Sequence, residues 1–117
     1  MTDLVTVYTG MDFYCDVAIP KRVPLRIEYE SDSVLAFVHT RPCWAVYIVV
    51  VPKKHIASFT TLSEEDTPIL LELFEALKKI AARVEHDFGG ARILTNLGYY
   101  QDSKHLHFHV NSGHQLR

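Results

Sequence analysis

The pattern of hydrophobic and polar positions predicts strands on both sides of one long helix. Residues 26–30 alternate polar and apolar side chains, which is typical of a strand with one buried face. Residues 34–38 are continuously apolar and residues 45–51 are dense in β-branched side chains, and both features favour buried strands. Toward the C-terminus, residues 92–96 and 104–111 are interpreted as a fourth and a fifth strand.

The long helix is predicted between the third and the fourth strand. Ser63 or Thr67 can cap its N-terminus, and Pro68 suits the first helical position if Thr67 is the cap. Gly89-Gly90 is expected to end it. Apolar residues recur at helical spacing and predict one buried stripe, formed by Leu70, Leu73, Phe74, Leu77, Ile80, Ala81, Val84 and Phe88.

This order of elements predicts an α+β fold, in which a mostly antiparallel five-stranded sheet is covered on one face by the long helix. A short helix is also expected. The prolines at positions 20 and 24 bracket residues 21–23, which are interpreted as a turn or one short helical turn.

Length and charge narrow the class of protein. The chain has 117 residues, enough for one domain, which we expect over residues 12–117 after a loosely held N-terminal arm over residues 1–11. A net charge of −2 argues against an extended nucleic-acid surface and against an anionic-membrane partner. The longest apolar run is too short to span a bilayer and no secretory signal is evident, so we expect a cytoplasmic protein with reduced Cys15 and Cys43.

The segment most indicative of function is 104–110, where histidines alternate with apolar residues. In a strand, successive side chains point to opposite faces, so one face would carry His105, His107 and His109. Side chains two residues apart on one face lie about 6.5–7 Å from each other. At that spacing the three imidazoles can converge on one bound group or pass protons between them.

Spacing alone leaves three interpretations of these histidines open. They can form a solvated, histidine-rich strand face, a catalytic site, or a mononuclear metal site that keeps a fourth position for water. The sequence offers no cysteine or carboxylate directly beside them that would complete a closed site, and this disfavours a structural zinc ion.

Several segments, in order, resemble the histidine triad family of nucleotide hydrolases and transferases, and the resemblance extends from about Asp12 onward. It is carried by residues 34–37, 49–56 and 94–98, by Gln101, and by residues 105–110. The last segment fits the family pattern of three histidines separated by single apolar residues, except that Asn111 is polar in its final place. The chain is most similar in style to the histidine-triad nucleotide-binding proteins.

The resemblance implies a covalent mechanism at phosphorus without a metal ion or cofactor. His107 would attack the α-phosphorus of a nucleotide ester, anhydride or phosphoramidate and form a nucleotidyl-histidine. His109 would contact the phosphate and assist proton delivery to the leaving group, and His105 would fix the geometry and tautomer of its neighbour. The substrate-binding residues implied in the same way are Phe37, His39, Tyr47, Asn96, Gln101 and Ser103.

Three positions depart from the family pattern. Tyr47 stands where many relatives carry a further histidine, and tyrosine cannot hold a proton at neutral pH as histidine does. His39 stands where relatives place an acid that grips the ribose hydroxyls, and Asp102 introduces an acid near the phosphate position. These departures leave open a second reading, a nucleotide-binding module of low activity.

The resemblance also implies a small-molecule nucleotide as partner and a homodimer, in which the long helix and the central strand pair across a twofold axis. Lys53 and Lys54 either steer phosphate or belong to a solvated turn, and His55 either closes the edge of the site or has a structural role.

Overall fold

The computed structural model describes residues 12–40, 42 and 44–116. The predicted arm over residues 1–11 and the predicted state of Cys43 lie outside the described residues, so the proposed domain boundary stays a prediction. Within the described residues Cys15 is a free thiol, as expected.

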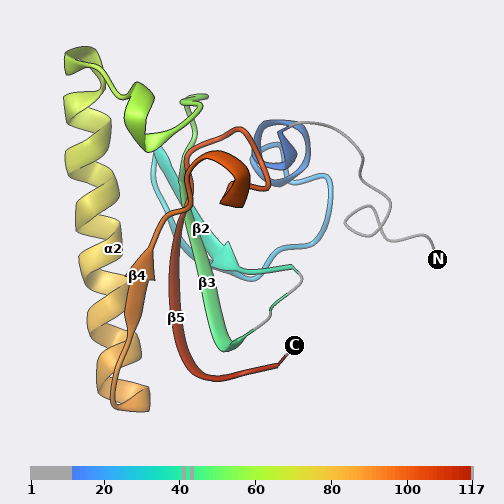
Figure 1. Ribbon diagram of the computed structural model, residues 1–117, viewed down its shortest axis with the longest axis vertical. Helices are drawn as coiled ribbons and strands as arrows, with labels where there is room; N and C mark the ends of the chain where they lie inside the picture. The colour runs from blue at the N-terminus through green and yellow to red at the C-terminus, as the bar shows by residue number, and fades with distance from the viewer. Residues whose placement is uncertain (1–11, 41, 43, 117) are drawn as a thin grey trace.

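Five strands form one antiparallel sheet (Figure 1), which confirms the predicted fold class. The strands are β1 (Ile27–Glu30), β2 (Val34–Val38), β3 (Trp44–Pro52), β4 (Arg92–Leu94) and β5 (Phe108–Gln115). Their order across the sheet is β1-β2-β3-β5-β4, and each neighbouring pair is antiparallel. β3 therefore lies in the middle of the sheet, bonded to β2 on one side and β5 on the other, and β4 lies at an edge.

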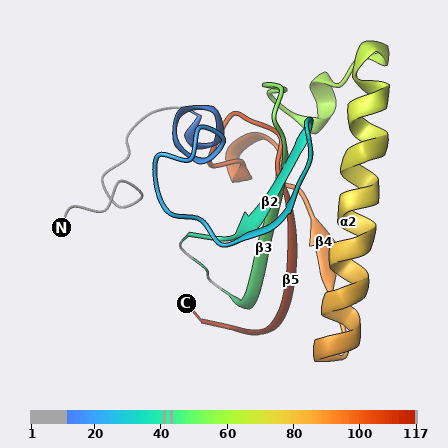
Figure 2. The ribbon, with the colours of Figure 1, turned by 180° about the vertical axis from the view of Figure 1, so that it is seen from behind.

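Helix α2 (Thr67–Phe88) covers one face of this sheet, as Figures 1 and 2 show from opposite sides. Pro68 lies in its first turn, and Gly89 ends it with a left-handed φ of 85°, which glycine adopts without a steric penalty. Thr67 is the first helical residue rather than the cap. Asp66 takes the cap position, at the end of a short 3₁₀ turn that starts after Ser63.

The buried stripe of α2 is narrower than the sequence predicts. Its centre is buried against the sheet, at Leu73, Ala76, Leu77, Ile80 and Val84. Phe74 is 47% exposed and Phe88 60% exposed, so these two predicted core positions are wrong. Phe74 lies about 100° around the helix from Leu73, and Phe88 occupies the last helical position beside Gly89. No helix in the described part of the chain is long and apolar enough to cross a membrane.

A short helix is present, and it lies before the segment that the two prolines bracket. Helix η1 (Tyr14–Ala18) is a single wide turn in which the Ile19 N–H donates to the Tyr14 carbonyl at 2.8 Å. Residues 19–21 form a turn in which the Lys21 N–H donates to the Ala18 carbonyl at 3.0 Å and Lys21 has a left-handed φ of 58°, so the helical alternative for residues 21–23 does not hold. Helix η1 packs against the face of the sheet opposite α2, where Tyr14 and Ala18 meet Leu35, Phe37 and Val49.

The last strands are shorter at one end than predicted. β4 ends at Leu94 rather than at residue 96, and β5 begins at Phe108 rather than at residue 104. The backbone before Phe108 pairs with the loop after β3, since the Leu106 N–H donates to the Ile56 carbonyl at 2.6 Å. The alternation of faces persists through this segment, because Leu106, Phe108 and Val110 all join the core beneath α2.

Candidate active site

A cavity of about 180 Å³ lies on the face of the sheet opposite α2, since its lining residues Tyr14, Phe37 and Val49 belong to the apolar cluster between η1 and the sheet. Two of the three alternating histidines, His107 and His109, form part of its wall. The remaining lining residues come from η1, the ends of β2 and β3, and the segment before β5: Phe13, Tyr14, Phe37, His39, Thr40, Tyr47, Val49, Asn96, Asp102 and Ser103.

The ring of His107 is held in one tautomer by the backbone. Its Nδ1 donates to the carbonyl oxygen of His105 at 2.7 Å, which leaves Nε2 with the lone pair. Burial is the largest influence on its pKa and lowers it, and the nearby His105 charge acts in the same direction. Thr95 supports the same residue, since its hydroxyl donates to the His107 carbonyl at 2.7 Å. The structure therefore presents a neutral imidazole with a fixed ring orientation.

His109 is buried, with only 3% of its surface exposed. Among the described residues, neither of its ring nitrogens has a hydrogen-bond partner. Burial lowers its pKa to about 3, assisted by the positive charges that His107 and His39 would carry. The ring lies 4.9 Å from that of His107 and 5.0 Å from that of Tyr47, measured between centroids. Two unpartnered nitrogens on a cavity wall are suited to a ligand that supplies their hydrogen bonds.

The residues that depart from the family pattern lie together on the cavity wall. The His39 and Tyr47 rings stack with centroids 4.5 Å apart, and the His39 N–H donates to the Tyr47 carbonyl at 2.8 Å. Asp102 also lines the cavity and is itself exposed. Sequence reasoning did not single out Thr40, whose hydroxyl-bearing side chain belongs to the same wall.

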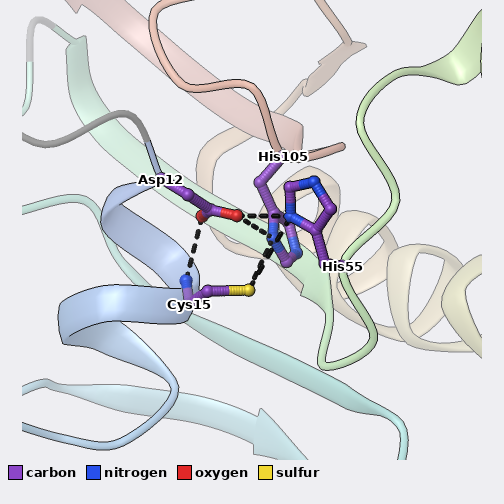
Figure 3. Close-up of side chains that lie close together, drawn as sticks. All are labelled: Asp12, Cys15, His55 and His105. Atoms are coloured by element: carbon purple, nitrogen blue, oxygen red, sulfur yellow. Dashed lines mark hydrogen bonds and ion pairs between the residues drawn. The ribbon is translucent and has the colours of Figure 1, made fainter.

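His105 does not line the cavity. It is fully buried, its Nε2 donates to the Pro52 carbonyl at 2.8 Å, and its Nδ1 lies 3.0 Å from Asp12 Oδ2. Cys15 and His55 complete this group, which Figure 3 shows converging from three parts of the chain. The burial of Asp12 would raise its carboxyl pKa, but the N–H of Cys15 and the charge of His105 together hold it below its ordinary value.

Of the predicted substrate-binding residues, Phe37, His39 and Tyr47 line the cavity, as do Asn96 and Ser103. Gln101 does not. Its side-chain nitrogen donates to the Ala57 carbonyl at 2.7 Å, which ties the loop before β5 to the loop after β3.

Sequence reasoning missed Asp12 and Thr95, and their partners show why. Asp12 is 93 positions from His105, and Thr95 acts on a backbone carbonyl that carries no side-chain signature. Lys53 and Lys54 pair with Glu30 and Asp66, and neither lysine lines the cavity, which argues against a role of either in steering phosphate.

The three alternating histidines do not form the metal site considered from their spacing. Within the described residues, the one group of potential ligand atoms that lie close enough together joins His105 to Asp12, Cys15 and His55, and includes neither His107 nor His109.

Comparisons with known proteins agree with this geometry. The family described as "Scavenger mRNA decapping enzyme C-term binding" matches residues 12–116. An uncharacterized HIT-like protein of Rickettsia prowazekii is 33% identical over 101 residues, which make up 84% of each chain. The chain belongs to the histidine triad (HIT) family.

Solved structures give the same result. The HIT family hydrolase from Legionella pneumophila has a TM-score of 0.76 at 27% identity, over 91% of this chain and 96% of that one. A histidine triad protein from Clostridium difficile has a TM-score of 0.75 at 32% identity, over 95% of this chain and 97% of that one. The five-stranded sheet with one long helix is therefore the fold of this family.

Proposed function

We propose that this protein is a nucleotide hydrolase or transferase that cleaves phosphoramidate or phosphoanhydride bonds through a covalent intermediate on His107. The observation that carries the proposal is the tautomer and protonation state of the His107 ring. Because Nδ1–H is held by the His105 carbonyl and burial lowers the pKa, Nε2 of a cavity-lining histidine keeps its lone pair at neutral pH. A positioned neutral imidazole is a competent nucleophile toward phosphorus.

In the first step, Nε2 of His107 forms a bond to the α-phosphorus while the bond from phosphorus to the leaving amine or phosphate breaks. The electron pair of that bond stays with the leaving group, which needs a proton. His109 is the proposed donor. Its pKa is low in the empty cavity, but an anionic phosphate beside the ring raises it and favours the protonated form. Water then attacks the nucleotidyl-histidine and regenerates the imidazole.

The cavity wall is suited to a nucleotide. Among its lining residues, Phe37 and Tyr14 can offer apolar ring contacts, and Asn96 and Ser103 can offer hydrogen bonds. Relatives support the reaction class, since two of the solved structures are described as HIT family hydrolases and the matching family is described by an mRNA-decapping enzyme.

The test is turnover of adenosine 5′-monophosphoramidate and of a dinucleoside polyphosphate by the wild-type protein and by His107→Ala. We expect the substitution to lower kcat/KM by about 10⁴-fold or more, because it removes the attacking atom. Intact mass spectrometry of quenched wild-type reactions should show one added nucleotidyl group, which His107→Ala lacks. His86→Ala, an exposed histidine on α2, is the matched control and should behave as wild type.

One observation favours a second candidate, a nucleotide-binding module with little turnover. Asp102 places a carboxylate on the wall of the cavity that would receive the phosphate, and Tyr47 packs on His109 without being able to relay a proton at neutral pH. Calorimetry with AMP and GMP beside the turnover assay separates the two. Tight binding with turnover equal in wild type and His107→Ala would replace the first proposal with the second.

We also propose a homodimer, with a different interface from the one predicted. β3 cannot pair across a twofold axis, because β2 and β5 occupy both of its edges. β4 is an edge strand, and its Ile93 and Leu94 are 53% and 37% exposed. Exposed apolar side chains on an edge strand beside a helix suit pairing with a second copy. A monomeric mass in solution would contradict this proposal.

A further inference from the structure

The cavity wall carries a fixed negative charge and no fixed positive charge. Among the described residues that line it, Asp102 is the only carboxylic acid, and no lysine or arginine is present. Phosphate oxygens in proteins are usually met by cationic side chains, with which they form strong hydrogen bonds. The cavity therefore offers a bound nucleotide one side chain that stays ionised at neutral pH, and its charge has the same sign as the phosphate.

The cationic side chains of this part of the fold do not pair with that carboxylate. Lys104, two positions further along the chain, donates from Nζ to the Gly98 carbonyl at 3.3 Å. Arg92, at the edge of the sheet, donates to Asn111 at 2.9 Å. Among the described residues, Asp102 has no hydrogen bond or ion pair of its own. Its two oxygens are thus left to water or to a cationic group of a ligand.

Asp102 acts electrostatically on the proposed nucleophile. Burial is the largest influence on the pKa of His107 and lowers it, and the Asp102 charge works in the opposite direction because it favours the protonated ring. In the proposed reaction, the atoms bonded to phosphorus lie next to this ring. The same charge therefore acts on the phosphate and on the leaving group of a bound substrate.

The part of the substrate that meets Asp102 follows from the segments that form the wall. The apolar lining belongs largely to the cluster between η1 and the sheet, which suits an uncharged nucleobase. Asn96, Asp102 and Ser103 all come from the connection between β4 and β5, and this connection also carries His107. Since the nucleobase and the ribose are uncharged at neutral pH and the phosphate is an anion, only the leaving group can supply a positive charge there.

We propose that Asp102 selects substrates in which the leaving group carries a positive charge, as a diamine does when one nitrogen is bonded to phosphorus and the other is an ammonium group. This inference rests on the proposed function. His107 Nε2 bonds to the α-phosphorus as the P–N bond breaks, and the leaving nitrogen keeps the electron pair and takes up a proton. The ammonium group is unchanged throughout, so Asp102 decides which substrate binds and takes no part in the bond changes.

The experiment compares two ligands of equal length that differ in charge. They are the N-(3-aminopropyl) and N-butyl phosphoramidates of adenosine 5′-monophosphate, and their dissociation constants are measured by calorimetry on His107→Ala so that neither is consumed. At about pH 8 an imidazole with the ordinary pKa of about 6.5 is neutral, whereas an aliphatic ammonium group stays charged. Because the phosphate is common to both ligands, its repulsion cancels in the ratio of the two constants.

Removing the carboxylate should abolish the part of the preference that is due to charge. We expect Asp102→Asn to shift the ratio of dissociation constants by about fivefold against the aminopropyl ligand, the effect of one exposed ion pair. Asp102→Lys should shift the ratio further in the same direction, since it reverses the charge. High salt should reduce both shifts, because it screens exposed charges. Asp102 is exposed, so neither substitution disturbs the core.

Asp32→Asn, which changes an exposed acid between β1 and β2, is the matched control and should leave the ratio as it is. The inference is overturned if both Asp102 variants leave the ratio unchanged, if Asp32→Asn shifts it as much, or if neither ligand binds. Turnover of the same ligands by the wild-type chain tests the proposed function separately. Hydrolysis with an unchanged ratio would reject charge selection alone, and a charge-dependent ratio without hydrolysis would reject the proposed hydrolase alone.

Discussion

His105 and His109 belong to one run of alternating histidines and point to the same side of the chain, yet their surroundings are opposite. His109 is buried on a cavity wall with neither ring nitrogen bonded within the described part of the protein. Both ring nitrogens of His105 are engaged, one by the Pro52 carbonyl and one by the Asp12 carboxylate. Lying on the same side of one segment therefore does not give two residues the same chemistry, because that depends on which other segments contact them.

His107 lies between these two environments and draws on both. Its Nδ1 is tied to the backbone of His105, and its ring lines the cavity together with His109. The buried group around Asp12 and His105 thus fixes the position of the His107 ring, and the cavity is where a ligand would meet it. The following conditions and substitutions, in order of decreasing expected effect, test this distinction.

Acid should destabilise the protein through His109 before its carboxylates titrate. The pKa of His109 is about 3 in the folded chain and about 6.5 when unfolded, so the unfolded state binds the extra proton between these values. Stability from this group is present above pH 6.5 and is lost as pH falls, at about 1.4 kcal/mol per pH unit. Unfolding free energies between pH 6.5 and 5 check this.

His109→Gln is the informative variant for that series, because it keeps a polar side chain of similar size but does not titrate. The free energy of unfolding of His109→Gln should fall less steeply with decreasing pH than that of the wild type, by most of the roughly 1.4 kcal/mol per pH unit that His109 contributes. The pKa of His107 is also lowered, so part of the slope should remain. An unchanged slope in His109→Gln would show that His109 is not neutral in the folded protein.

Asp102→Asn should have the smallest effect and should act only on substrate affinity. Asp102 lines the cavity but is exposed, so water screens its repulsion of an anionic substrate to about 1 kcal/mol or less. We expect KM to fall by about threefold with kcat unchanged. Asp32→Asn, an exposed acid in the turn between β1 and β2, serves as the control. A raised KM would instead indicate that Asp102 binds substrate.

Local features of the fold could be predicted from sequence because they depend on neighbouring residues. Pro68 fixes its own φ near the helical value and Gly89 can adopt the left-handed φ that ends a helix, so the start and end of α2 follow from the chain itself. The short apolar runs in β2 and β3, rich in β-branched residues, likewise favour buried strands. The sequence did not indicate the helical turn over residues 14–18, which packs against Leu35, Phe37 and Val49 of the sheet.

The candidate site shows the same division. Alternation alone puts His105, His107 and His109 on one side of the chain, and this held even where the strand ladder stops before Phe108. It could not show that Gln101 turns toward Ala57, or that His105 leaves the cavity to join Asp12 and Cys15.

The sequence by itself determined the elements, their order and the shared side of the three histidines, because each follows from backbone preferences and periodicity over a few residues. Only the tertiary structure decided which histidine meets a cavity and which meets a carboxylate and a thiol. Those partners are 93 and 90 positions from His105 along the chain. They come into contact only when packing both faces of the sheet offsets the entropy of closing such long loops.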